Sequence, residues 1–120
     1  MREVALPDII AAVFLFYPED EFQNDRESLH KAFWEIRGKH RGLLGDLLFR
    51  KSMLFPRSRI LDEILASLQP EFLGKINPTF ATYTIKKDQL RRLWELRLKQ
   101  HLQEHEPELK TIAEELSQIL

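Results

Sequence analysis

The apolar positions of the 120-residue chain repeat at helical spacing over most of its length. Residues 7–16 are apolar at almost every position, which predicts a first helix that is largely buried. A second helix is predicted to begin after Asn24 or Asp25, either of which can cap it, and to end near Gly38. Its apolar face consists of Leu29, Ala32, Phe33 and Ile36. The acidic run at residues 19–21 predicts a solvated turn between the two helices.

The middle of the chain contains one further helix, over residues 58–69. Ser58 can cap this helix and Pro70 closes it. Its apolar stripe consists of Ile60, Leu61, Ile64, Leu65 and Leu68. Residues 42–49 are ambiguous, because their leucines suit a short helix whereas each of two glycines weakens a helix by about 1 kcal/mol relative to alanine.

The period then changes from that of a helix to that of a strand. Residues 72–76 and 80–85 predict two strands around a tight turn at residues 77–79, and the second strand is rich in aromatic and β-branched side chains. A two-stranded hairpin alone is marginally stable in water. We therefore expect this hairpin to pack against the preceding helices.

Helical spacing returns from Asp88 to the end of the chain. One face of the first C-terminal helix consists of Leu90, Leu93, Trp94, Leu98 and Leu102. Pro107 either starts a second helix or kinks a continuous one. The stripe of that last segment, formed by Leu109, Ile112, Leu116 and Leu120, either folds back on the domain or meets a second copy. Because an apolar stripe of this kind suits a symmetric interface, we expect a homodimer through these four residues.

The order of the predicted elements is similar to that of the winged helix-turn-helix superfamily: several helices, then a capped helix, then a hairpin. The capped helix has the sequence Phe55-Pro56-Arg57-Ser58-Arg59-Ile60-Leu61 at its start. The resemblance covers residues 7–85. It implies a mainly α fold with a small β-hairpin, in which residues 1–86 form a winged-helix-like core and residues 87–120 form C-terminal amphipathic helices.

In that superfamily the helix before the hairpin enters the DNA major groove, and the hairpin, or wing, approaches the DNA backbone. The resemblance assigns these parts to residues 58–69 and to a wing tip at Lys75, Asn77 and Thr79. Asp62 and Glu63 depart from this pattern, because acidic groups repel phosphates unless they accept a hydrogen bond from a cytosine amino group.

The charge of the chain is segregated along the sequence. The total is 18 Lys and Arg against 19 Asp and Glu, a formal charge of −1. Residues 37–59, however, hold seven Lys or Arg and one acidic residue, whereas both ends of the chain are acidic. A near-neutral total is therefore compatible with a nucleic-acid partner.

The basic segment supplies most of the candidate binding residues. Arg and Lys neutralise phosphates and release counterions, and side chains at the start of a recognition helix reach bases or phosphates. The predicted nucleic-acid-binding residues are Arg57, Arg59, Ser58, Arg50, Lys51, Arg41, Lys39 and Lys75. The expected function is that of a small regulatory protein that binds double-stranded DNA. The alternative is a protein-protein interaction module or complex subunit without DNA binding.

Other chemistries find less support in the residues. The chain has no cysteine, which excludes disulfides, thiolate metal sites and cysteine catalysis. His101, Glu104 and His105 match the H-x-x-E-H pattern of inverted zinc proteases, but a polar helix end explains them better, because only fifteen residues remain to supply a third ligand. His30 and His40 stand apart from other catalytic residue types in sequence. We therefore predict no enzyme, no cofactor and no metal site.

The longest apolar run, residues 4–17, is shorter than the roughly 20 residues of a membrane-spanning helix. We therefore expect no membrane association and a cytoplasmic location.

Overall fold

The computed structural model describes residues 5–23, 25–51, 54–75 and 82–120. The protein is mainly helical and contains one small antiparallel sheet. In chain order the elements are α1 (Leu6–Phe16), β1 (Glu21–Gln23), α2 (Arg26–Lys39), α3 (Arg41–Leu44), α4 (Arg59–Ser67), β2 (Leu73–Lys75), β3 (Thr82–Ile85), α5 (Lys87–Leu93), α6 (Lys99–Leu102) and α7 (Glu106–Ile119). A π-helical turn over Trp94–Leu98 joins α5 to α6, and a 3₁₀ turn over Gln103–His105 joins α6 to α7.

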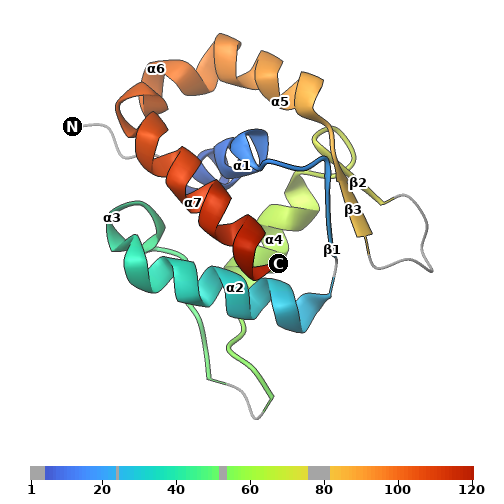
Figure 1. Cartoon of the computed structure of the whole chain (residues 1–120), viewed down its shortest axis with the longest axis vertical. Coiled ribbons are helices and arrows are strands. Elements are labelled where there is room, and N and C mark those ends of the chain that lie inside the picture. Colours follow the sequence, from blue (N-terminus) through green and yellow to red (C-terminus); the bar gives the residue numbers. More distant parts are fainter. Residues whose placement is uncertain (1–4, 24, 52–53, 76–81) are drawn as a thin grey trace.

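Helix α1 lies at the centre of the molecule. Residues 9–15 are all buried, which confirms the prediction of a largely buried helix. Helices α7, α5 and α3 pack around it, and Figure 1 shows α7 crossing in front of it. Lys87, at the start of α5, donates hydrogen bonds to the carbonyl oxygens of Leu15 and Tyr17. Because these carbonyls end α1 and have no partner within that helix, Lys87 both satisfies them and fixes α5 against α1.

The C-terminal stripe is covered by the chain itself. Leu109, Ile112 and Leu116 are 0% exposed, and α7 packs on α1 and α2. Leu120 is partly buried against the same core. Pro107 lies in the first turn of α7, so it starts this helix instead of kinking a longer one. The first three side chains, which the sequence assigns to a dimer interface, are therefore core residues in this structure.

The sheet has three strands in the order β1-β3-β2, and both pairs are antiparallel. The predicted strand pairing is confirmed, with Leu73 opposite Ile85. The predicted turn at residues 77–79 lies outside the described residues. Phe22 is opposite Tyr83 and stacks between the rings of Phe14, at 4.8 Å, and Tyr83, at 5.1 Å. The sheet is thereby joined to the buried face of α1.

The solvated turn predicted at residues 19–21 is confirmed for residues 19 and 20, which form an exposed bend, whereas Glu21 belongs to strand β1. Glu21 begins this strand and pairs with Thr84, although its side chain is exposed. A three-residue strand is too short to show an alternating pattern in the sequence. Its hydrogen bonds to a distant strand create it.

The π-helical turn explains the four-residue spacing of the buried face in the first C-terminal helix. Leu90, Trp94, Leu98 and Leu102 are all buried. In an α-helix of about 3.6 residues per turn, positions four apart drift around the axis by roughly 40° at each step. The wider π turn reduces this drift. The four side chains therefore face the core together.

The other predictions concern the helices near the middle of the chain. The helices expected over residues 24–38 and 58–69 are confirmed as α2 and α4. Only the first part of the ambiguous segment 42–49 is helical, as part of the short helix α3 (Arg41–Leu44), whose C-cap is Gly45. A Cβ at Gly45 would lie 2.5 Å from the Arg41 carbonyl oxygen, so only glycine fits there. Within the described ranges, the search for helices able to cross a membrane finds no candidate.

Candidate functional site

The segment between α3 and α4 brings two arginines together across a short antiparallel bridge. The Arg50 amide donates to the Arg57 carbonyl oxygen at 2.7 Å, and the Arg57 amide donates to the Arg50 carbonyl oxygen at 3.0 Å. Two residues that exchange both hydrogen bonds stand directly opposite and place their side chains on the same face. Like charges in this arrangement are destabilising. The bridge therefore places two cationic side chains on one face of the segment.

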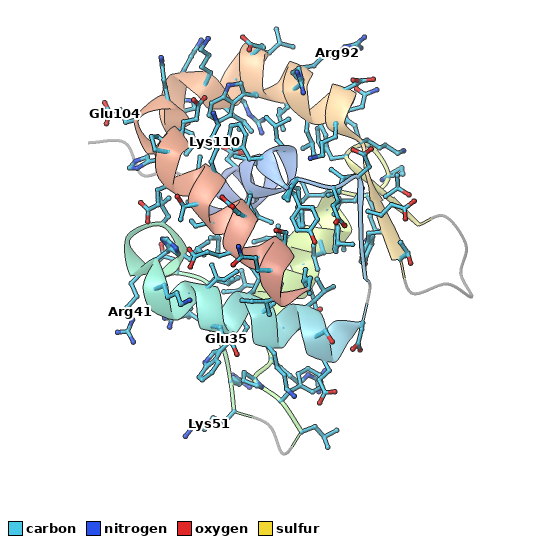
Figure 2. The ribbon with its side chains drawn as sticks, in the orientation of Figure 1. Glu35, Arg41, Lys51, Arg92, Glu104 and Lys110 are labelled. Carbon is cyan, nitrogen blue, oxygen red and sulfur yellow. The ribbon has the colours of Figure 1, made fainter. Side chains whose placement is uncertain are left out.

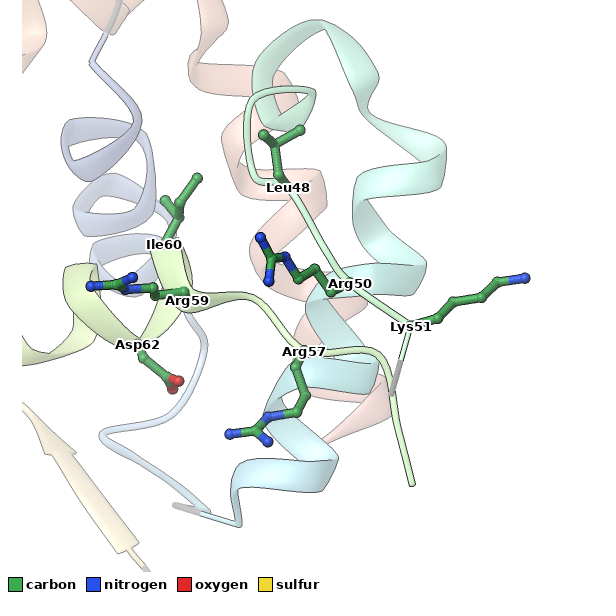
Figure 3. Close-up of a pocket in the computed structure, with 7 residues that line it drawn as sticks. All are labelled: Leu48, Arg50, Lys51, Arg57, Arg59, Ile60 and Asp62. Atoms are coloured by element: carbon green, nitrogen blue, oxygen red, sulfur yellow. The ribbon is translucent and has the colours of Figure 1, made fainter. Parts of the chain in front are cut away.

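The two arginines open onto a cavity of about 670 Å³. We call it the basic pocket; it is lined by Leu48, Arg50, Lys51, Arg57, Arg59, Ile60 and Asp62. In Figure 3 the side chains of Arg50, Arg57 and Arg59 extend to the same side of the bridge, whereas Lys51 extends to the opposite side. This is the alternation expected of neighbouring residues in an extended chain. Three guanidinium groups thus dominate the pocket.

The pocket carries an excess of positive charge. The side chains of Arg50, Lys51 and Arg57 have no ion-pair partner within the part of the chain that the structure describes. Arg59 is paired with Glu63 at 3.1 Å, as its i, i+4 spacing predicts, but both side chains are largely exposed and such pairs are weak. The Arg57 guanidinium also lies 5.9 Å from the centre of the Phe55 ring. An anion that entered the pocket would therefore meet cations that the protein does not neutralise.

A buried histidine fixes the pocket against helix α2. His30 is 1% exposed, and its Nδ1 accepts a hydrogen bond from the Ser58 backbone amide at 2.9 Å. Because a backbone amide can only donate, Nδ1 carries no proton and Nε2 carries it. Nε2 then donates to Oδ1 of Asp62 at 2.9 Å. The rings of Phe49 and Phe55 pack edge-on against the imidazole, with distances between ring centres of 6.4 and 6.0 Å.

Ser58 has a structural role at the start of α4. Its hydroxyl oxygen accepts a hydrogen bond from the Leu61 amide at 3.1 Å, which confirms the predicted cap. Serine, histidine and aspartate thus meet at this point, as they do in hydrolytic triads. Here the Ser58 contact to the imidazole is made by its backbone amide, and the residue is 1% exposed. These contacts describe a capped helix, in which the buried Ser58 hydroxyl serves as the cap.

The predicted nucleic-acid-binding residues divide into two groups. The first group lines the basic pocket and consists of Arg50, Lys51, Arg57 and Arg59. Ser58 lies between two of these residues and caps α4. Lys39 and Arg41 lie outside the lining. Lys39 is paired with Glu115 at 3.4 Å, and Figure 2 shows Arg41 beside the helices whereas Lys51 is out on the loop. The side chain of Lys75, and residues 77 and 79 of the expected wing tip, lie outside the described part of the protein.

The remaining histidines form no metal site in the described ranges. The helix is interrupted by the 3₁₀ turn between His101 and His105. A search for groups of three or more metal-ligating side chains among the described residues finds no candidate. His40 instead contacts two carboxylates of α7: Nδ1 lies 2.9 Å from Oε2 of Glu108, and Nε2 lies 2.6 Å from Oε1 of Glu115.

Two features of the basic pocket were not visible in the sequence, and a third was visible only in part. Leu48 and Ile60 give it an apolar wall, Asp62 gives it an acidic group, and His30 holds that group in place. Only Asp62 carried a signal, because its position in the first turn of α4 is visible in the sequence. Comparison with known proteins finds no matching family model, no matching curated protein and no matching solved structure.

Proposed function

We propose that the protein binds double-stranded DNA through the basic pocket and the start of α4, in the manner of a winged-helix regulator. The observation that carries this proposal is the pair of arginines held opposite each other by the Arg50–Arg57 bridge. An arrangement that costs stability in the free protein is favourable once a polyanion neutralises it. DNA phosphates are such a polyanion, and arginine binds them through two hydrogen bonds.

The order of elements supports the same proposal. Helices α1, α2, α3 and α4 precede the paired strands β2 and β3, which is the order of helices and hairpin that the winged-helix resemblance implies. Helix α4 precedes the β2–β3 pair, which is the place of the recognition helix. Its first turn borders the basic pocket, so phosphate-binding and base-reading groups would lie side by side.

The test compares two double variants by titration of a labelled duplex at several salt concentrations. In Arg50→Ala with Arg57→Ala, we expect affinity to fall at least tenfold at about 0.1 M salt. The slope of log affinity against log salt should become shallower by about 2, since each lost phosphate contact contributes about 0.9. The matched control is Arg91→Ala with Arg92→Ala, which removes the same charge from an exposed part of α5.

The control variant should keep its affinity to within about threefold, because its arginines lie on another element. Chemical unfolding should show that the bridge variant is no less stable than the wild type, since it removes a like-charge pair. Undetectable binding of the wild type at about 50 mM salt would refute the proposal. So would an equal loss of affinity in both variants.

A second candidate is a protein-interaction module, which the apolar groups around the pocket favour. Leu48 lines the pocket and is 61% exposed, and Leu54 on the same loop is 79% exposed. A partner segment that alternates acidic and apolar residues could pair its acidic side chains with the arginines and its apolar side chains with these leucines. This candidate predicts binding of a synthetic Asp-Leu repeat peptide, lost in the Arg50, Arg57 variant, together with no affinity for DNA.

The homodimer stays a prediction, and light scattering of the purified protein tests it. Because Leu109, Ile112 and Leu116 are buried within one chain, a dimer of this fold needs another surface.

A further inference from the structure

Asp62 is the one acidic side chain among the described residues that line the basic pocket. Its presence beside three arginines is at odds with a pocket that binds phosphate alone, since a carboxylate repels phosphate. Its side chain is 36% exposed, so a ligand can reach it. Asp62 therefore points to a second recognition element in the ligand, different from the phosphate.

The Asp62 side chain is held in place by a rigid contact. His30 is buried, and its proton is confined to Nε2 because Nδ1 accepts from the Ser58 amide. The Nε2 proton is donated to Oδ1 of Asp62 at 2.9 Å. An acceptor whose direction is fixed by a buried partner can discriminate between ligands, since it cannot turn away from an unsuitable group.

The chemistry of the major groove selects the ligand group. A carboxylate has only acceptors, so it needs a donor on the base edge. Cytosine presents its N4 amino group there. Adenine also presents an amino group, but its N7 acceptor lies beside it and would repel the carboxylate. Guanine and thymine present only acceptors at their polar positions in this groove.

Resting on the DNA-binding function proposed above, we propose that Asp62 is a specificity-determining residue that accepts a hydrogen bond from a cytosine N4 amino group in the major groove. The first turn of a recognition helix is the part that contacts base edges, and Asp62 is the fourth residue of α4. In Figure 3 its carboxyl group lies on the same side of the segment as the guanidinium groups of Arg57 and Arg59. Those groups hold the phosphates, and His30 acts as a positioning residue.

The experiment compares Asp62→Asn with Glu63→Gln, which removes one negative charge from the neighbouring position. Glu63 does not line the pocket, and its carboxylate pairs with the exposed Arg59. Duplexes selected by the wild-type protein from a random-sequence pool supply the preferred site. Affinities are then measured for that site and for versions with each base pair replaced.

Glu63→Gln should bind all duplexes severalfold more tightly than the wild type at low salt, because it loses a repulsive charge. Asp62→Asn should show the same gain only on duplexes that lack the preferred cytosine. Only Asp62→Asn should lose the wild-type preference for cytosine, which we expect to be about tenfold, since one good base contact discriminates by roughly that factor. Glu63→Gln should keep it.

A second measurement uses the wild-type protein alone, so it does not depend on the folding of a variant. A duplex whose selected cytosine lacks the N4 amino group should bind about tenfold more weakly than the parent duplex, to the same degree as a replaced base pair. This loss should be absent in Asp62→Asn.

The failures of the two proposals are distinguishable. If the wild type binds duplexes with no cytosine preference, or if both variants keep that preference, the role of Asp62 is wrong and DNA binding stands. If the wild type binds no duplex at about 50 mM salt, both proposals are wrong.

Discussion

At the scale of single residues, His30 determines how the basic pocket is held. One imidazole satisfies the Ser58 amide, donates to Asp62 and fills the space between Phe49 and Phe55. Each contact reaches a different part of the segment that follows α3. A buried polar group stabilises a fold only when its hydrogen bonds are satisfied, and here both ring nitrogens are satisfied.

Replacing His30 tests this role. In His30→Leu the Ser58 amide loses its acceptor while it stays buried. We expect the free energy of unfolding to fall by about 1 to 3 kcal/mol, measured by urea titration. Lys31→Leu, at an exposed neighbouring position of α2, should change it by less than about 0.5 kcal/mol. Equal stability of the two variants would contradict the structural role of His30.

At the scale of elements, His40 joins the end of α2 to α7. Its ring lies between the carboxylates of Glu108 and Glu115, and Lys39 adds a second contact to Glu115. Burial opposes the charged imidazole, but the hydrogen bonds to Glu115 and Glu108 outweigh it and raise the pKa of His40. The hydrogen bond from His40 lowers the pKa of Glu115. Both shifts indicate that the charged pair stabilises the contact between α2 and α7.

The direction of the His40 shift predicts how stability depends on pH. A histidine whose pKa is higher in the folded state contributes its full stability below about pH 6.5 and loses it as the pH rises through the raised pKa. His40→Gln should therefore be less stable than the wild type by about 1 kcal/mol at about pH 5.5. The difference should shrink by about pH 8.5, in urea unfolding at each pH.

The control for this prediction is His105→Gln. His105 makes no ion pair within the described part of the chain, so this variant should show no comparable pH-dependent difference. At more acidic pH the lowered pKa of Glu115 sets the opposite limit. The stabilisation is then lost as the pH falls through that pKa. A His40→Gln difference that grows with rising pH would contradict the assignment.

At the scale of the whole molecule, the two ends of the chain form one core. Helix α1 is apolar on every side, so the helices that cover it must come from elsewhere in the sequence. Helices α5 and α7 supply much of that cover, although more than 70 residues separate them from α1. The C-terminal helices therefore complete the core on which β1 and α4 are placed.

This closure makes the stability of the protein sensitive to α7. Leu116→Ala should lower the free energy of unfolding by about 2 to 5 kcal/mol, because it leaves a cavity among side chains that are fully buried. Gln118→Ala, on the exposed side of the same helix, should change it by less than about 0.5 kcal/mol. A small effect of Leu116→Ala, together with dissociation of an oligomer, would instead assign this residue to an interface between copies.

The local elements of the fold were largely predictable. Ser58 caps α4 as its sequence position indicates, and the apolar stripes of α2 and α4 face the core. These features depend on residues within one or two helical turns of each other. Strand β1 was not predictable in this way, because it exists through hydrogen bonds to β3, more than 50 residues away. Among the described residues, the sequence pattern therefore failed to predict structure where that structure depends on contacts between distant segments.

The sequence by itself determined the helices, the hairpin strands and the concentration of basic residues between positions 37 and 59, because periodicity, capping and charge are local properties. Only the tertiary structure decided that Arg50 stands opposite Arg57, that His30 holds Asp62 from 32 residues away, and that the last helix lies on α1. Each of these contacts depends on how distant segments pack together. Packing is selected by the burial of the whole core, and a local pattern does not contain that information.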